Sequence, residues 1–174
     1  EFWHVGQMPV PADDPLHGAM APNVWPSEVT EFEDIYAELY QALERTGNRI
    51  LSAIAIHLGL DKDWFAPTVH YGNSVMRLLH YPPVSEAAEG AVRAAAHEDI
   101  NTITLLLGAE EAGLELQRKD GSWMPIDPPA GALVVNIGDM LQRLTAGRLV
   151  STTHRVVNPV GEAARRARYS MPFF

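Results

Sequence analysis

Short segments with strand character, separated by turns, occupy the chain from residue 75 to its end. Residues 75–81 alternate loosely between apolar and polar types and stop at Pro82 and Pro83. Proline ends a strand because it cannot donate to the ladder of backbone hydrogen bonds. Similar segments follow at residues 103–107, 114–117, 122–126, 133–137, 149–157 and 168–174. Several short strands at regular spacing predict a sandwich or barrel of antiparallel strands.

The first part of the chain carries a helical pattern instead. Apolar residues recur at spacings of three and four from Val29 to Leu43, and the pattern resumes at residues 50–58. We therefore predict a long N-terminal helix, either continuous or broken near Gly47. Ser27 is the expected N-cap, because its hydroxyl can accept a hydrogen bond from a free N–H of the first turn. A further one or two helical turns are predicted at residues 139–144.

Composition limits the class of protein. A chain of 174 residues with 47% hydrophobic side chains is long enough for one compact domain, so we expect residues 1–174 to form a single domain. The formal charge of −9 argues against a nucleic-acid partner, which would need Lys and Arg to neutralise phosphates. No apolar run approaches the ~20 residues of a membrane span, so we expect no membrane partner. The oligomeric state stays open.

Cysteine is absent, so any metal must be held by histidine and carboxylate. The absence also fits a reducing compartment, and we expect a cytoplasmic protein. The chain starts at Glu1 within a segment typical of a domain interior. We therefore expect it to lack an N-terminal portion and a C-terminal tail.

The strongest chemical signal is a His-x-Asp pair followed by a distant histidine. In a strand, His97 and Asp99 would share one face with Cα atoms about 6.6 Å apart. Such a pair alone occurs often by chance, on the surface. His154, about 55 positions beyond Asp99 in another strand-like segment, adds a third ligand. Two histidines and one carboxylate form the facial triad of oxygen-activating iron(II) enzymes, whereas structural zinc is closed and four-coordinate.

Arg168 and Ser170 form a second candidate group. Alternation places them on the same face of the last predicted strand, and a guanidinium can grip both oxygens of a carboxylate. The competing interpretation is a solvent-facing arginine in a basic tail, and the metal triad favours the binding role. We assign the other histidines to packing or surface positions, with His57 expected in the core because it follows an apolar helix stretch.

A series of sequence blocks also carries a family resemblance. They lie at residues 1–6 (EFWHVG), 76–83 (MRLLHYPP), 96–106 (AHEDINTITLL), 113–117 (GLELQ), 120–123 (DGSW), 135–142 (VNIGDMLQ), 151–156 (STTHRV) and 168–170 (RYS). In this order the blocks resemble the isopenicillin N synthase-like family of iron(II) and 2-oxoglutarate-dependent dioxygenases, over nearly the whole chain.

The resemblance implies a mainly β fold with flanking helices, a double-stranded β-helix (a cupin-like jelly roll) with iron inside one open end. It implies Fe(II) and 2-oxoglutarate as cofactors, with Arg168 and Ser170 holding the far carboxylate of 2-oxoglutarate and Tyr81 as a further contact. The family reaction uses O2 on a small organic substrate and releases succinate and CO2. Hydroxylation is the usual outcome, and desaturation and ring closure also occur.

Three rival interpretations remain. An iron oxidase of the isopenicillin N synthase type would use the Arg and Ser pair for its own substrate and need no 2-oxoglutarate. A non-catalytic jelly-roll binding module would not need three metal ligands, and a zinc hydrolase would need a general base that the sequence does not offer beside the triad.

Two positions depart from the family pattern, since Ala146 and Leu79 stand where relatives often carry Asn.

Overall fold

The computed structural model describes residues 1–84, 91–108 and 113–174. These residues make two compact units. The first contains residues 1–3, 77–172 and 174, and the second contains residues 4–76 and 173. In the described part of the chain, no helix has the length and apolar character needed to cross a membrane.

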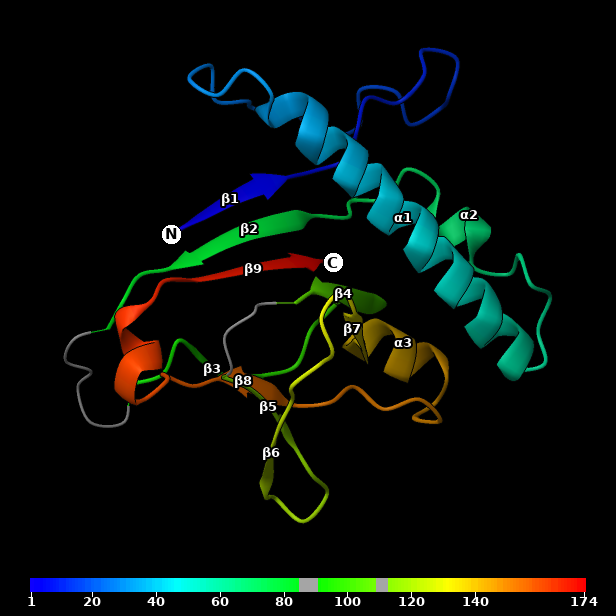
Figure 1. The fold of residues 1–174 in the computed structure, drawn as a ribbon. Coiled ribbons are helices and arrows are strands. Elements are labelled where there is room, and N and C mark those ends of the chain that lie inside the picture. The colour runs from blue at the N-terminus through cyan, green and yellow to red at the C-terminus, as the bar shows by residue number, and fades with distance from the viewer. Residues whose placement is uncertain (85–90, 109–112) are drawn as a thin grey trace. The chain divides into compact units, whose positions relative to one another are not determined.

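The first unit is built mainly from β-strands, which confirms the predicted fold class at that level (Figure 1). The strands form a five-stranded sheet with the order β1-β2-β9-β4-β7 and a four-stranded sheet with the order β3-β8-β5-β6. Their bounds are Phe2–Val5 (β1), Met76–Tyr81 (β2), Ala94–His97 (β3), Ile103–Leu107 (β4), Leu114–Gln117 (β5), Trp123–Pro125 (β6), Leu133–Ile137 (β7), His154–Val156 (β8) and Arg168–Phe173 (β9).

Antiparallel register decides which side chains meet. Strand β3 pairs with β8 so that His97 lies opposite His154. Strand β4 pairs with β7 so that Thr104 lies opposite Asn136. Side chains directly opposite each other in such pairs stand close enough to interact. Pairing therefore brings together residues that are far apart in the sequence.

Strands β4, β5 and β7 match their predicted ranges, and β8 is shorter than predicted. Strand β1, the short helix α2 (Ala66–Val69) and the 3-10 helix η1 (Gly161–Arg165) were not predicted. Each of these elements contains only four or five residues, which is too few for a periodic pattern to emerge. Strand β1 depends on its pairing with β2, which local sequence does not specify.

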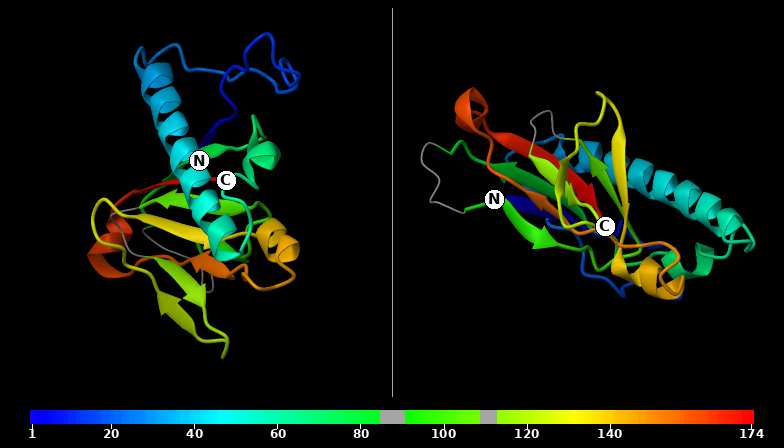
Figure 2. Two further views of the ribbon diagram at one scale, coloured as in Figure 1. Left: turned by 90° about the vertical axis from the view of Figure 1, so that its right-hand side faces the viewer. Right: turned by 90° about the horizontal axis from the view of Figure 1, so that it is seen from below.

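Helix α1 (Phe32–His57) dominates the second unit and runs without interruption through Gly47 (Figure 2). It starts beyond the predicted N-cap Ser27, and Glu31 at its N-cap makes no side-chain capping bond. Its buried positions recur at spacings of three and four: Tyr40, Leu43, Gly47, Leu51 and Ala55. His57 is exposed, so its expected core position was wrong. It follows Ala55 by two residues, a rotation of about 200° that turns it away from the buried face.

Helix α3 (Asp139–Leu144) appears where it was predicted. Just beyond its end, Ala146 has a φ of 49° and Gly147 a φ of 77°. The left-handed region is unfavourable for alanine but accessible to asparagine and glycine. Asn, which the family resemblance leads us to expect at position 146, would suit this backbone better than the Ala of this chain.

Glu44 gives a pH-dependent test of the second unit. Burial raises the pKa of its carboxyl in the folded protein, and the nearby Arg45 offsets part of that effect. Glu44 therefore stabilises the fold when protonated, and this contribution is lost as the pH rises through the folded pKa. We expect Glu44→Gln to raise the melting temperature near neutral pH and to have little effect below about pH 4. Thermal unfolding at both pH values checks this, with the exposed Glu38→Gln as the control, and a shift that is equal at both would contradict it.

Candidate functional site

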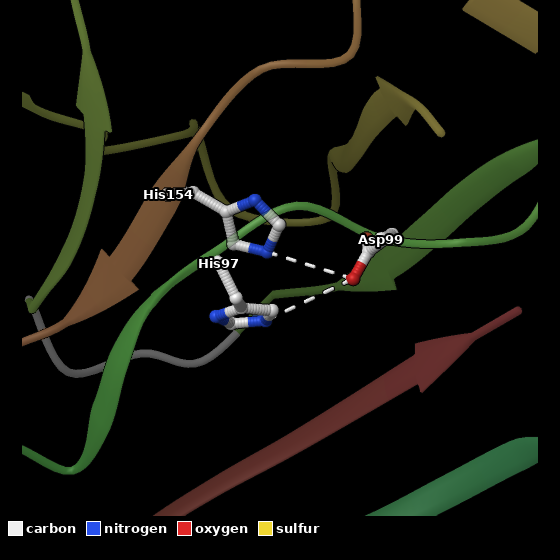
Figure 3. A group of neighbouring side chains, drawn as sticks. All are labelled: His97, Asp99 and His154. Carbon is white, nitrogen blue, oxygen red and sulfur yellow. Dashed lines mark ion pairs between the residues drawn. The ribbon is translucent and has the colours of Figure 1, made fainter. Parts of the chain in front are cut away.

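Three side chains from two segments converge at one point in the first unit (Figure 3). The Oδ1 atom of Asp99 lies 3.8 Å from Nε2 of His97 and 3.8 Å from Nε2 of His154. The two imidazole rings have centroids 4.3 Å apart. Both oxygen–nitrogen distances are below about 4.4 Å, twice the usual length of a bond from a metal to nitrogen or oxygen. One ion can therefore reach all three residues.

The local geometry differs from the prediction in one respect. His97 is the last residue of β3, and Asp99 lies two residues beyond that strand instead of on the same strand face. Helix α3 fixes this connecting segment, because the Asp139 amide donates to the carbonyl oxygen of Asp99 (2.8 Å) and the Gly138 amide donates to that of Thr102 (3.0 Å). His97 and Asp99 therefore come together in an irregular segment that follows β3, and not by alternation within one strand.

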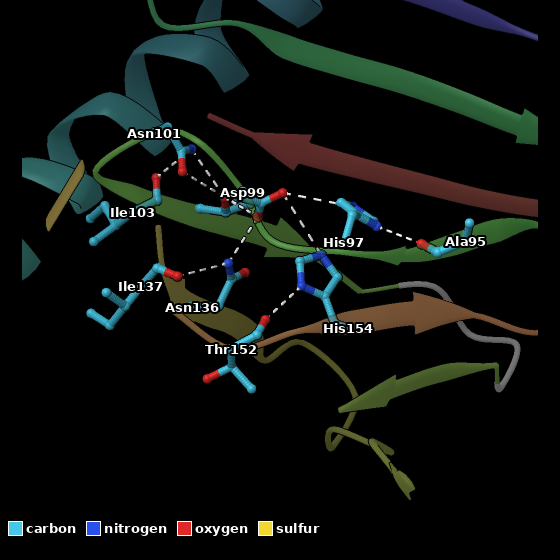
Figure 4. Close-up of polar contacts among 10 residues, drawn as sticks. Ala95, His97, Asp99, Asn101, Ile103, Asn136, Ile137, Thr152 and His154 are labelled. Carbon is cyan, nitrogen blue, oxygen red and sulfur yellow. Dashed lines mark hydrogen bonds and ion pairs between the residues drawn. The ribbon is translucent and has the colours of Figure 1, made fainter. Parts of the chain in front are cut away.

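Both histidines are oriented by backbone carbonyl groups (Figure 4). Nδ1 of His97 bonds to the carbonyl oxygen of Ala95 (2.7 Å), and Nδ1 of His154 bonds to that of Thr152 (3.0 Å). Since a carbonyl oxygen can accept but not donate, each Nδ1 carries the proton. In the neutral ring the lone pair then belongs to Nε2, the nitrogen that faces Asp99, as in histidines that bind metals.

The carboxylate of Asp99 is equally fixed. Its Oδ2 accepts hydrogen bonds from Oγ1 of Thr104 (2.6 Å) and Nδ2 of Asn136 (2.8 Å), which leaves Oδ1 facing the histidines (Figure 4). The Asp99 side chain is 6% exposed, that of His154 is 13% exposed and that of His97 is 47% exposed. Sequence reasoning did not single out Thr104 or Asn136. The sequence signal that could have identified them is that Thr104 and Asn136 lie in two of the blocks that resemble the family.

The three residues open into a cavity of about 140 Å³ between strands of both sheets. Alternate residues of the strands line it, as expected when one face of each strand points inward. Arg168, Ser170 and Tyr81 line the same cavity, so the structure brings all six predicted site residues together. Leu79, which departs from the family pattern, also lines it. The other lining residues are Arg77, Ala94, Thr104, Leu106, Leu114, Leu116, Asn136, Val156, Pro172 and Phe174.

Arg168 is a buried cation in this cavity. It is 2% exposed, and its guanidinium carbon lies 5.5 Å from the centre of the Tyr81 ring. Ser170, two residues along β9, is also buried. Arg93 places a second guanidinium 5.6 Å from the centre of the Tyr81 ring, and its Nη2 donates to the carbonyl oxygen of Pro82. The sequence offered no signal for Arg93, because its contact with Tyr81 depends on where β2 and β3 lie.

The remaining histidines stay outside the cluster. Among the described residues that could share an ion, the group of three or more donors consists of His97, Asp99 and His154. Two imidazole nitrogens and one carboxylate oxygen are the donor set of a mononuclear iron(II) centre, and they would hold such an ion from one side. A mainly β fold with this donor set in the lining of a cavity is the arrangement of a non-haem iron oxygenase.

Comparison with known proteins agrees with that class. Residues 72–174 match the family model of the 2OG-Fe(II) oxygenase superfamily. The chain belongs to this superfamily. The match includes all six predicted site residues and nearly all of the first unit.

Related sequences and structures give the same family. The chain is 38% identical over 159 residues to the 2-oxoglutarate-Fe(II) type oxidoreductase hxnY of Emericella nidulans, covering 88% of this chain and 44% of that protein. A crystal structure of a 2OG-Fe(II) oxygenase family protein from Caulobacter crescentus is similar with 55% identity and a TM-score of 0.91, over 99% of this chain and 55% of that one. A full-length Neurospora crassa protein, crystallised in complex with alpha-KG, gives 33% identity and a TM-score of 0.86, over 99% of this chain and 56% of that one. The chain thus spans about half the length of these relatives.

Gly138 allows a test of how the Asp99 segment is held. A Cβ at this position would overlap the backbone and side-chain oxygens of Asn101. We expect Gly138→Ala to lower the free energy of unfolding by roughly 1–3 kcal/mol, as overpacking does, and to weaken metal binding as the Asp99 segment moves. Thermal unfolding and metal titration check both effects.

Gly108→Ala is the matched control, because a Cβ there would meet its nearest atom at 3.8 Å, an ordinary contact. Equal melting temperatures and equal metal affinities for the two variants would show that Gly138 does not constrain the segment.

Proposed function

We propose that this protein is an Fe(II)- and 2-oxoglutarate-dependent dioxygenase that oxidises a small organic substrate, with hydroxylation as the expected reaction. The metal ligands are Nε2 of His97, Oδ1 of Asp99 and Nε2 of His154. One observation carries the proposal: the ligand atoms of these residues face one another while their other polar atoms are engaged elsewhere. When bound, iron and 2-oxoglutarate supply the oxygen chemistry, in which O2 oxidises the substrate and 2-oxoglutarate gives succinate and CO2.

The protein would contribute binding and orientation. Arg168, Ser170 and Tyr81 would hold the far carboxylate of 2-oxoglutarate. A buried guanidinium is suited to this role because charge-assisted hydrogen bonds are strong where water is excluded. With the carboxylate fixed at one place in the cavity, the other end of 2-oxoglutarate can lie against the three metal ligands that line the same cavity.

The apolar part of the lining would hold the substrate and limit water. Leu79, Leu106 and Leu116 lie on three different strands around the cavity. Relatives include a protein named proline hydroxylase buaE from Petromyces alliaceus, 36% identical over 173 residues, covering 94% of this chain and 53% of that protein. A small-molecule substrate is consistent with that relative.

We propose that the two sheets form a double-stranded β-helix, with the site at one open end. The single domain over residues 1–174 and the cytoplasmic location stay predictions. They are supported by the length of the chain and by the absence of cysteine.

The metal assignment is tested by adding Fe(II) and 2-oxoglutarate without oxygen and recording the visible charge-transfer band of the chelate. We expect the band with the wild-type protein and its loss in His97→Ala and Asp99→Ala, because two ligands hold a ferrous ion much more weakly than three. His57→Ala, which removes an exposed histidine of α1, is the control and should keep the band. A normal band in Asp99→Ala would rule out this assignment.

The 2-oxoglutarate assignment is tested with Arg168→Ala. Removing one partner of a buried charge pair costs about 2 kcal/mol or more, so the dissociation constant of 2-oxoglutarate should rise at least ~30-fold. Titration of the charge-transfer band measures it, with the exposed Arg166→Ala as control. An unchanged constant would remove Arg168 from this role. Turnover of substrate without 2-oxoglutarate, and no succinate, would favour an oxidase of the isopenicillin N synthase type.

A further inference from the structure

We propose that Thr104 and Asn136 are positioning residues that restrict Asp99 to binding the metal through one oxygen, and so keep the opposite face of the metal open. The proposal rests on the metal role assigned to Asp99 above. It gives a function to residues in two blocks of the sequence, 96–106, which contains two of the metal ligands, and 135–142, which contains none.

The hydrogen bonds around Asp99 have a defined direction. The Thr104 hydroxyl has one proton, and its shortest contact is with Oδ2 of Asp99 at 2.6 Å. The same hydroxyl oxygen accepts a hydrogen bond from Nδ2 of Asn101 at 3.0 Å, which directs its proton toward the carboxylate. Nδ2 of Asn136 donates to Oδ2 from a second direction at 2.8 Å. Two donors thus converge on one carboxylate oxygen.

The two donors come from a rigid part of the fold. Thr104 and Asn136 are direct partners in the antiparallel pair of β4 and β7. Thr104 is 3% exposed, so water does not compete for its hydroxyl. Because both donors are carried by paired strands, the ladder keeps the backbones of Thr104 and Asn136 side by side. The direction of Oδ2 is therefore set by donors on the sheet, in addition to the contacts that hold the segment carrying Asp99.

This arrangement has a consequence for the metal. A carboxylate can bind a metal through one oxygen or through both. An oxygen that already accepts two hydrogen bonds is a poorer ligand, so Oδ2 is held away while Oδ1 faces the histidines. Without the donors, Oδ2 could turn to the metal and take a position that 2-oxoglutarate or O2 needs. The two hydrogen bonds also compensate the carboxylate, which is 6% exposed, for the water that it loses on burial.

The test uses Co(II) as the probe, since its visible bands weaken as the coordination number rises. Thr104→Val removes the hydroxyl at nearly constant volume, and Asn136→Leu removes the amide. We expect each to raise the Co(II) dissociation constant by about 10- to 100-fold, the usual effect of losing such a partner, and to weaken the bands of the bound ion. Thr104→Ser, which keeps the hydroxyl, should restore both the affinity and the spectrum.

Thr102→Val is the matched control, because it is a half-buried threonine of the same segment whose side chain is not in the network. It should match the wild type in affinity and spectrum. Asn136→Leu keeps the experiment decisive if Thr104→Val fails to fold. A purely structural role would lower the melting temperature and leave the spectrum of the bound ion unchanged.

The outcomes separate the two proposals. If wild-type protein does not bind Co(II), or Asp99→Ala binds it as well as wild type, the metal assignment fails. If wild type binds and Asp99→Ala does not, but Thr104→Val and Asn136→Leu keep the wild-type affinity and spectrum, the positioning role alone is overturned. Loss of affinity with a changed spectrum in both variants, and recovery in Thr104→Ser, supports it.

Discussion

The site depends on a carboxylate buried at the place where two sheets face each other. An isolated charge at the depth of Asp99 would be costly, and it persists because donors surround one of its oxygens. Because both hydrogen bonds go to Oδ2, Oδ1 is the oxygen that remains available to a metal ion. The two imidazole Nε2 atoms then face the remaining oxygen, so three donor atoms of the kinds that suit iron(II) are already gathered at one point.

The same sheets also carry the other half of the site. Alternate residues of β9 place Arg168 and Ser170 inward, and the exposed Tyr169 between them points the other way, where it stacks on His80. Tyr81 on the neighbouring β2 contacts both Arg168 and Arg93 through its ring. The same small cavity is thus lined by three residues suited to a cation and by Arg168 and Ser170, which are suited to an anion. A co-substrate that chelates metal at one end and carries a carboxylate at the other matches both.

Helix α3 links the strands to the ligand segment. Its first residues donate to the carbonyl groups of Asp99 and the residues after it, and Gly138 leaves the space that Asn101 occupies. The block at residues 135–142 therefore combines a strand, a close contact without a side chain and a helix start. Each part acts on the position of a single aspartate, which explains why these residue types occur together.

The sequence by itself determined the mainly β class of the fold and most strand positions, because period-two patterns and turn residues act locally. It also led to the proposed chemistry of the site, because metal ligands are of few types. His97, Asp99 and His154 could be named from residue type and spacing together with a family resemblance. The tertiary structure alone decided that Asp99 lies beyond β3. It also decided that Thr104 and Asn136 donate to Asp99 and that Arg93 lies against the Tyr81 ring. The pairing of Thr104 with Asn136 follows from the register between strands distant in the chain. Register depends on the packing of whole sheets, which no local pattern of residues specifies.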